Sequence, residues 1–568
     1  MSKRIPKKMR STAQRKPQVS DSQISLESIA AAEHLVGVRY TAQERALMLD
    51  NLEGQIVNAQ ARRAVDLPNA APMALRFDPR LPGFVMPTQE GVSLTATTTP
   101  VPDNETDIAY ATVQELSHWI ATGALTSRRL TEIYLGRIEA YNPELLCFAT
   151  VTSDLALSEA DAMDTLTQKG TNLGPLHGIP YGLKDLFDTK GIVTGWGAEP
   201  YRDRVPDADA RIVTLLRAAG AVLLGKTTVG ALAYNDIWYG GQTRNPWNPA
   251  EGASGSSAGS ASATAAGLCG FSIGTETLGS ITSPCQRCGT TGLRPTFGRI
   301  SRTGGMALCW SLDKVGPICR GVDDTALVLD VLNGPDPEDR GSIAASFQYD
   351  AQKDIRDLTL GYLPEAFDEG ATEVDHAALA AARDLGLNVV EVSLPDLPYD
   401  ALMNTVYAEA AAAFEALTLS DTDDTLTWQE AAAWPNIFRK ARFLSAVDHV
   451  QLDRLRYLVM QALDALFRDI DALIGPFSTG PMLVASNFTG HPCLHMRAGF
   501  GHHATRSPGS LGAGKLTAGP LEATSAAHRV PQGISIWSRL FDEGTILRIG
   551  HALEQQLDVC RVRPPLTL

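Results

Sequence analysis

Apolar side chains recur at helical spacing near the start of the chain. Thr41 and Glu44 have the spacing of a capping box, and the apolar residues that follow at helical intervals predict a helix over about 42–62. A second capping box opens a predicted helix near 112–123, which a glycine ends. A third helix is expected from about 127 to 142, where an Asn-Pro pair stops it.

Short apolar runs alternate with helical segments through the rest of the chain. Such alternation favours an α/β architecture with a large mixed, mostly parallel β-sheet. The predicted strands are 221–224, 268–273, 358–363 and 387–392. Helices are expected over 325–332 and within 402–470. Four aromatic residues of the second segment are expected in the core, with a place in the wall of a substrate pocket as the alternative: Trp428, Trp434, Phe438 and Phe443.

Prolines separate an extension from the main domain. Five prolines lie between positions 68 and 87, and they exclude long regular elements there. Residues 24–105 are therefore predicted to be an N-terminal helical extension, and residues 106–568 the main domain. Two roles are open for the extension, which either packs against the main domain or forms the contact of a homodimer.

Two segments are expected to lack fixed structure. Residues 1–23 form a basic tail, in which the first sixteen residues include seven basic and no acidic ones. Because no apolar segment follows, the tail is not a secretory signal, and a transit peptide or a nucleic-acid-binding arm is the alternative to plain disorder. Residues 500–527 are rich in Gly, Ser and Ala, which predicts a mobile surface loop.

Composition narrows the class of protein. The 568 residues are 44% hydrophobic, which is typical of a globular protein. A net charge of -15 argues against a nucleic-acid-binding surface, and the absence of an 18-residue apolar run argues against a membrane span. Of the eight cysteines only Cys285 and Cys288 have Cys-x-x-Cys spacing, with no second pair. We therefore expect buried thiols, no metal site and a reduced, cytoplasmic location.

The stretch 254–284 carries the candidate chemistry. It combines glycine, alanine and hydroxyl residues with little apolar bulk, a composition that allows close backbone approach to a ligand. Ser256 and Ser280 are candidates to act together. Lys184 is the candidate proton acceptor, because it lies in an apolar run and burial lowers the pKa of a lysine. Pairing of this lysine with Asp185 is the structural alternative.

Five motifs together resemble the amidase signature family, whose members hydrolyse or transfer the acyl group of carboxamides. The resemblance is strongest over about 112–335. It implies an α/β amidase-signature fold with helices on both faces of the sheet, a catalytic domain over 106–568, and no metal or organic cofactor. The motifs are GIPYGLKD at 178–185, SGSSAGS at 254–260, GTETLGSITSP at 274–284, CGTTGLRPTFGRIS at 288–301 and SLDKVGP at 311–317.

The resemblance also implies roles for individual residues. Lys184 matches the general base, Ser256 the proton-relaying serine held by a cis peptide, and Ser280 the nucleophile that forms the acyl-enzyme. The neighbours of Ser256, Gly255 and Ser257, are expected to contact the substrate. Four consecutive backbone N–H groups are expected to form the oxyanion hole, those of Thr277, Leu278, Gly279 and Ser280.

Three positions depart from the family pattern. Leu278 stands where most members have glycine, and a positive φ there would strain a leucine. Thr282 stands in place of an arginine, and Glu276 in place of an aspartate. None of these changes touches Lys184, Ser256 or Ser280, but they weaken any transfer of substrate from better-known members.

The expected function is hydrolysis of a small linear amide, with esters and carbamates as further substrates. The alternatives are a glutaminase-type subunit of an amidotransferase and a non-catalytic family member. A rival interpretation takes Ser257 as the centre of a Gly-x-Ser-x-Gly nucleophile elbow, although the preceding residues are typical of turns rather than of a strand. In that interpretation the base is one of six late histidines: His491, His495, His502, His503, His528 and His551.

Overall fold

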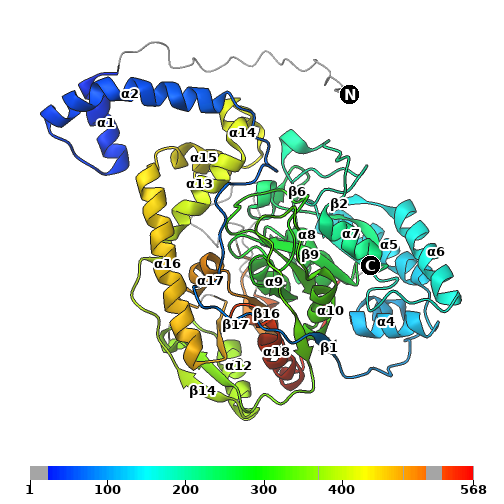
Figure 1. The fold of residues 1–568 in the computed structure, drawn as a ribbon. Helices are drawn as coiled ribbons and strands as arrows, with labels where there is room; N and C mark the ends of the chain where they lie inside the picture. The colour runs from blue at the N-terminus through cyan, green and yellow to red at the C-terminus, as the bar shows by residue number, and fades with distance from the viewer. Residues whose placement is uncertain (1–23, 369, 478, 507–526, 567–568) are drawn as a thin grey trace.

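The computed structural model describes residues 24–368, 370–477, 479–506 and 527–566 (Figure 1). The predicted basic tail, 1–23, lies outside the described residues, as does most of the predicted loop at 500–527. The first residues of that loop were predicted wrongly, because strand β16 continues to His503 and pairs there with β17.

A large mixed sheet forms the centre of the protein, which has an α/β fold (Figure 1). Its order is β14-β13-β15-β17-β16-β10-β11-β9-β3-β4-β2. The strands are β2 (Phe148–Val151), β3 (Pro180–Lys184), β4 (Val222–Thr227), β9 (Phe271–Glu276), β10 (Thr291–Arg294), β11 (Lys314–Cys319), β13 (Thr359–Tyr362), β14 (Asn388–Glu391), β15 (Ala472–Pro476), β16 (Cys493–His503) and β17 (His528–Ser538). All four predicted strands are present, as β4, β9, β13 and β14, with β9 displaced by three residues at each end.

The prediction that this sheet is mostly parallel was wrong. Among its described pairings six are antiparallel and four are parallel. The parallel pairs join β13 to β14 and β15, and β3 to β4 and β9, whereas β10, β11, β16 and β17 alternate in direction. Alternating helices and strands do not fix strand direction, which depends on whether each connection crosses over the sheet.

Helices cover both faces of the sheet. Gly292 of β10 faces Cys285 of α9. The next residue, Leu293, points to the opposite face together with its partner in β16, Leu494, which contacts Gly550 of α18. The main helices of this domain are α4 (Val113–Ala121), α5 (Ser127–Leu145), α6 (Ser153–Gln168), α7 (Arg211–Ala218), α8 (Ala258–Ala265), α9 (Thr282–Cys288), α10 (Val322–Leu332), α12 (Glu373–Asp384), α13 (Met403–Ala413), α14 (Glu415–Leu419), α15 (Trp434–Ala441), α16 (Ala446–Asp469), α17 (Met482–Thr489) and α18 (Glu543–Leu557).

The remaining elements are short. They are α3 (Glu105–Ala109), α11 (Pro364–Asp368), β5 (Ile237–Trp238), β6 (Gly241–Gln242), β7 (Arg244–Asn245) and β8 (Asn248–Gly252). Four 3-10 turns accompany them, at Glu199–Tyr201, Ala231–Ala233, Tyr399–Leu402 and Thr422–Thr425, within the residues that the structure describes.

Local sequence signals located the helices predicted over 42–62, 112–123 and 127–142, with an error at the end of the third. The two predicted capping boxes, at Thr41 and Thr112, are both formed. The stop expected at the Asn-Pro pair was wrong, because α5 includes Pro143 and ends at Leu145. Asn142 ends the helix differently: its Oδ1 accepts from the N–H groups of Cys147 and Phe148 just beyond the last turn.

The N-terminal extension is helical at its start and extended afterwards. Helices α1 (Leu26–Val36) and α2 (Ala42–Arg63) form a hairpin that projects from the main domain (Figure 1). Arg62 at the end of α2 pairs with Glu415 at 2.7 Å. The chain then follows the main domain to β1 (Gly91–Ser93), which pairs in parallel with β12 (Gln348–Asp350). The extension therefore packs against the main domain, while the homodimer contact stays a prediction.

The remaining predictions concern the cysteines, a membrane span and the aromatic residues of 402–470. Seven of the eight cysteines are buried, Cys285 and Cys288 among them, and all eight are free thiols. In the described part of the chain no helix combines the length and apolarity that crossing a membrane requires. Trp434 and Phe438 stack on each other in the core, which confirms for these two residues core burial rather than a place in a pocket wall.

Candidate active site

Lys184 ends the buried strand β3 and points at Ser256 and Ser257, the two serines that directly precede α8. Its Nζ lies 2.8 Å from Oγ of Ser256, 2.8 Å from Oγ of Ser257 and 2.8 Å from Oγ1 of Thr275. Thr275 belongs to β9, the parallel neighbour of β3, so the sheet register carries it alongside Lys184. The lysine is fully buried, and its contacts are hydroxyl groups and one main-chain carbonyl.

Burial lowers the pKa of Lys184 well below its ordinary value, while the carboxylates of Asp313 and Glu276 act in the opposite direction. The amine can thus lose its proton far more readily than an exposed lysine does. Asp185 does not pair with Lys184. Oδ1 of Asp185 instead lies 3.9 Å from Nζ of Lys226, a second buried lysine. The ion pair between Lys184 and Asp185 that the sequence left open is therefore not formed.

Ser256 follows a cis peptide bond with Gly255, as the family resemblance implied. It is almost fully buried against Lys184. Ser257 is also buried, and its Oγ lies between Lys184 and strand β9, donating to the carbonyl of Thr275 at 3.1 Å and accepting from its N–H at 3.2 Å. The substrate contact predicted for Gly255 and Ser257 stays a prediction.

The rival nucleophile elbow lacks its histidine. In the part of the chain that the structure describes, no histidine is hydrogen-bonded to Ser257, whose partners are Lys184 and Thr275. The described late histidines bond elsewhere: His491 to Thr489, His495 to Ser535, His503 to Gln532 and His551 to Asp323.

Ser280 lies on the loop that leads from β9 to α9. The N–H of Ser257 donates to its main-chain carbonyl at 3.2 Å, which holds the two serine segments together. The residue is 8% exposed, and within the described residues its Oγ makes no hydrogen bond to Ser256. The structure thus brings Lys184 and Ser256 into contact and ties Ser280 to them through the backbone.

The loop presents a row of unused backbone donors. No N–H of Thr277, Leu278, Gly279 or Ser280 donates to a protein acceptor within the described residues. The left-handed conformation falls on Gly279, with φ of 82°, and Leu278 has no positive φ. The leucine that replaces the usual glycine is therefore unstrained.

The buried carboxylate of Glu276 fixes the end of this loop by hydrogen bonds, and the sequence did not indicate its partners. Oε2 of Glu276 accepts from the N–H groups of Ile281 and Thr282, at 2.9 and 3.0 Å. Arg294 of β10 binds Oε1 at 2.7 Å, and Asn487 of α17 binds it at 3.0 Å. Burial alone would raise the pKa of Glu276, but Arg294 and the N–H donors lower it to about 2.

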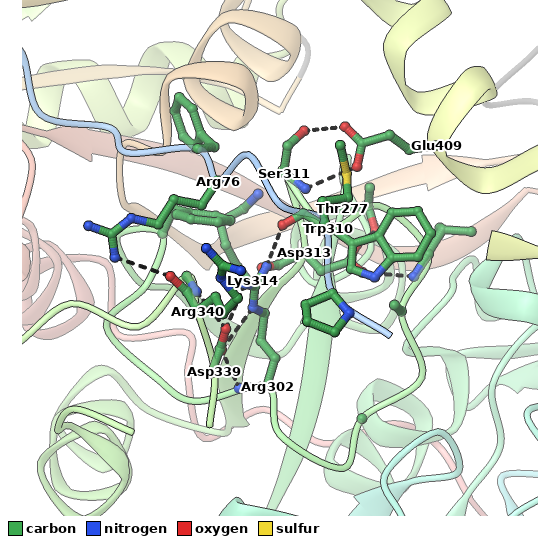
Figure 2. Close-up of a pocket in the computed structure, with 18 of the residues that line it drawn as sticks. Arg76, Thr277, Arg302, Trp310, Ser311, Asp313, Lys314, Asp339, Arg340 and Glu409 are labelled. Atoms are coloured by element: carbon green, nitrogen blue, oxygen red, sulfur yellow. Dashed lines mark hydrogen bonds and ion pairs between the residues drawn. The ribbon is translucent and has the colours of Figure 1, made fainter. Parts of the chain in front are cut away.

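A cavity of about 700 Å³ opens beside the loop (Figure 2). It reaches the end of β9 and the start of the loop at Thr275 and Thr277, whose hydroxyls bind Lys184 and Asp313. Lys184, Ser256 and Ser280 do not themselves line it. Helices α13 and α16 contribute to its wall as expected for 402–470, but through residues that the sequence did not single out, such as Glu409, Arg456 and Tyr457.

Comparison with known proteins assigns the family. The family model described as Amidase matches residues 129–547. The glutamyl-tRNA(Gln) amidotransferase A-subunit of Geobacter metallireducens is 33% identical, covering 78% of this chain and 96% of the relative, and that of a Synechococcus species is 31% identical, covering 80% and 98%. A native peptide amidase structure from Stenotrophomonas maltophilia is 28% identical with a TM-score of 0.66, covering 80% of this chain and 98% of its own. The chain belongs to the amidase signature family, whose fold and ordered motifs it carries.

Proposed function

We propose that this protein hydrolyses linear carboxamides through an acyl-enzyme on Ser280, with Ser256 as proton relay and Lys184 as base. The observation that carries the proposal is the contact between the buried Nζ of Lys184 and Oγ of Ser256, at 2.8 Å, beneath the loop of Ser280. A serine hydroxyl is a weak nucleophile until a base takes its proton, and an uncharged amine can take it.

In the first step Oγ of Ser280 attacks the amide carbon. Its proton passes to Ser256, and the proton of Ser256 passes to the neutral amine of Lys184, which becomes an ammonium. Hydrogen bonds between catalytic groups are often long in a free enzyme and shorten when substrate binds. This is consistent with the lack of a hydrogen bond between Oγ of Ser280 and Ser256 among the described residues. The unused N–H groups of residues 277–280 donate hydrogen bonds to the negative oxygen of the tetrahedral intermediate.

Collapse of the intermediate breaks the C–N bond. The leaving nitrogen takes the proton returned from Lys184 through Ser256 and departs as ammonia or an amine. A water molecule, deprotonated along the same route, then attacks the ester carbon of the acyl-enzyme. The carboxylic acid is released and Ser280 regains its proton.

The test is acylation and turnover by the isolated chain. A fluorophosphonate probe should label the wild-type protein and should not label Ser280→Ala. Likewise, the wild-type protein should release ammonia from simple amides, and Ser280→Ala should not. Labelling that survives in Ser280→Ala would overturn the assignment of the nucleophile, and absence of labelling in the wild type would favour a non-catalytic family member.

A second candidate is the glutaminase-type subunit of an amidotransferase. The similarity to amidotransferase A-subunits over about four fifths of this chain favours it. Such a protein would hydrolyse glutamine and pass the ammonia to a partner protein. Glutamine turnover that rises on adding a partner, with little turnover of other amides by the chain alone, would support this candidate over the first.

A further inference from the structure

The cavity beside the catalytic loop is closed on one side by the N-terminal extension. Residues 69–80, which we call the cavity-wall segment, contribute Asn69, Met73 and Phe77 to its lining. Figure 2 shows the blue backbone of this extension passing across the cavity, with Arg76 directed at the backbone of Arg340. The segment lies outside residues 129–547, the range that the family model matches.

Side-chain contacts fix this segment in place without helix or strand structure. Asn69 bonds the backbone of Ala307 in both directions, as donor at 2.7 Å and as acceptor at 2.8 Å. Phe77 meets the edge of the Phe297 ring, with 5.1 Å between centroids, and the guanidinium of Arg456 lies 3.4 Å from the centre of the Phe77 ring. A segment held at both ends in this way forms a wall rather than a loose flap.

The size and lining of the cavity indicate what it admits. About 700 Å³ suits a ligand of drug size and far exceeds the needs of acetamide. The lining also includes apolar side chains of the main domain, Phe297, Met306 and Trp310. Charged side chains line the cavity as well, and two of the acidic ones, Asp78 and Asp339, are each paired with an arginine, Arg80 and Arg302.

We propose that the cavity-wall segment determines substrate specificity, and that Phe77 and Met73 bind the apolar part of a bulky amide whose carbonyl reaches Ser280. This inference rests on the proposed function, since it assigns a substrate class to the same site. Burial of an aromatic or long aliphatic group in the cavity against Phe77 and Met73 would stabilise the complex by the hydrophobic effect. Acetamide would leave that space to water.

The test compares 4-phenylbutyramide with acetamide, both followed by ammonia release. Phe77→Ala should lower kcat/KM for 4-phenylbutyramide roughly tenfold, mainly through KM, and should leave acetamide within about twofold. Met73→Ala, which removes no anchoring contact, should act in the same direction. Val85→Ala is the matched control, because this exposed residue of the same extension does not line the cavity.

The outcomes separate the two proposals. Equal losses on both amides in Phe77→Ala and Met73→Ala, or no loss on either amide, would overturn the role of the segment while leaving amide hydrolysis intact. A wild-type protein that turns over neither amide and resists fluorophosphonate would overturn the proposed function, and the inference with it. Thermal melting of each variant distinguishes a change of specificity from a loss of folded protein.

Discussion

Nζ of Lys184 and Oγ of Ser256 lie 2.8 Å apart, and both residues are almost completely buried. The pair joins the end of strand β3 to the start of helix α8, 72 residues later in the chain. Because the surroundings of the amine are hydroxyls and a carbonyl rather than carboxylates in direct contact, burial dominates its protonation.

Replacing Lys184 should remove acylation. Lys184→Met keeps the length of the side chain but has no basic nitrogen, so kcat/KM for amides should fall by roughly 10²–10⁴. Lys226→Met is the control, because Lys226 is an equally buried lysine that bonds Thr189, Thr194 and a main-chain carbonyl instead of the serines. It should lower thermal stability yet still react with fluorophosphonate below its melting temperature. Equal reactivity of the two variants would contradict the role of Lys184.

Activity should fall as the pH decreases through the pKa of Lys184, because only the neutral amine accepts a proton. Asp313 raises that pKa by its charge, against the larger effect of burial. Asp313→Asn should therefore lower the pKa and move the acid limb of the kcat/KM profile to lower pH. The measurement is a pH profile of wild type and variant on one amide. A shift of the limb to higher pH would be incompatible with Lys184 as the base.

Glu276 should stabilise the fold as well as the loop. Glu276→Gln leaves Arg294 buried without its counter-charge, which typically costs about 3–5 kcal/mol. The pKa of Glu276 is lowered from 4.5 to about 2, so the stability difference between wild type and variant should be constant above pH 4.5 and shrink as the pH falls toward 2.

Urea unfolding at several pH values measures this difference. The matched control is Asp354→Asn, since Asp354 and its partner Arg356 form an exposed pair whose loss should leave the midpoint unchanged. A difference that grows as the pH falls would contradict the assignment to Glu276.

The left-handed turn at Gly279 should matter more than the size of its neighbour. The methyl group added in Gly279→Ala would meet no atom closer than 3.6 Å. The effect of the substitution therefore comes from the φ of 82°, which disfavours a side chain by about 1 kcal/mol. Relaxation of the turn would misdirect the N–H donors, and kcat should fall tenfold or more. Leu278→Ala should change kcat by less than threefold. Steady-state kinetics of both variants measure these losses of kcat. A larger loss in Leu278→Ala than in Gly279→Ala would argue against an oxyanion hole in this loop.

Much of the local structure was predictable from neighbouring residues. The capping boxes at Thr41 and Thr112 use side chains three residues apart, and the helices there begin where the sequence indicated. The contact of Lys184 with Ser256 was predicted from motifs separated in the chain, because the family resemblance supplied the geometry that spacing alone does not.

Other features depended on contacts between distant segments. The failure of the Asn-Pro stop in α5 shows that a proline in the last turn can be accommodated where an Asn side chain takes over the following N–H groups. Arg294 could be seen in the sequence only as part of a motif, since its pairing with Glu276 requires β10 and β9 to lie two strands apart in the same sheet.

The sequence by itself determined several helices and four strands of the large sheet, because periodicity and capping act over a few positions, and its motifs determined the family. Only the tertiary structure decided the directions of the strands, the partners of Glu276 and the closing of the cavity by residues 69–80. These depend on which surfaces meet when the chain folds, and the free energy of such contacts is shared by segments hundreds of residues apart.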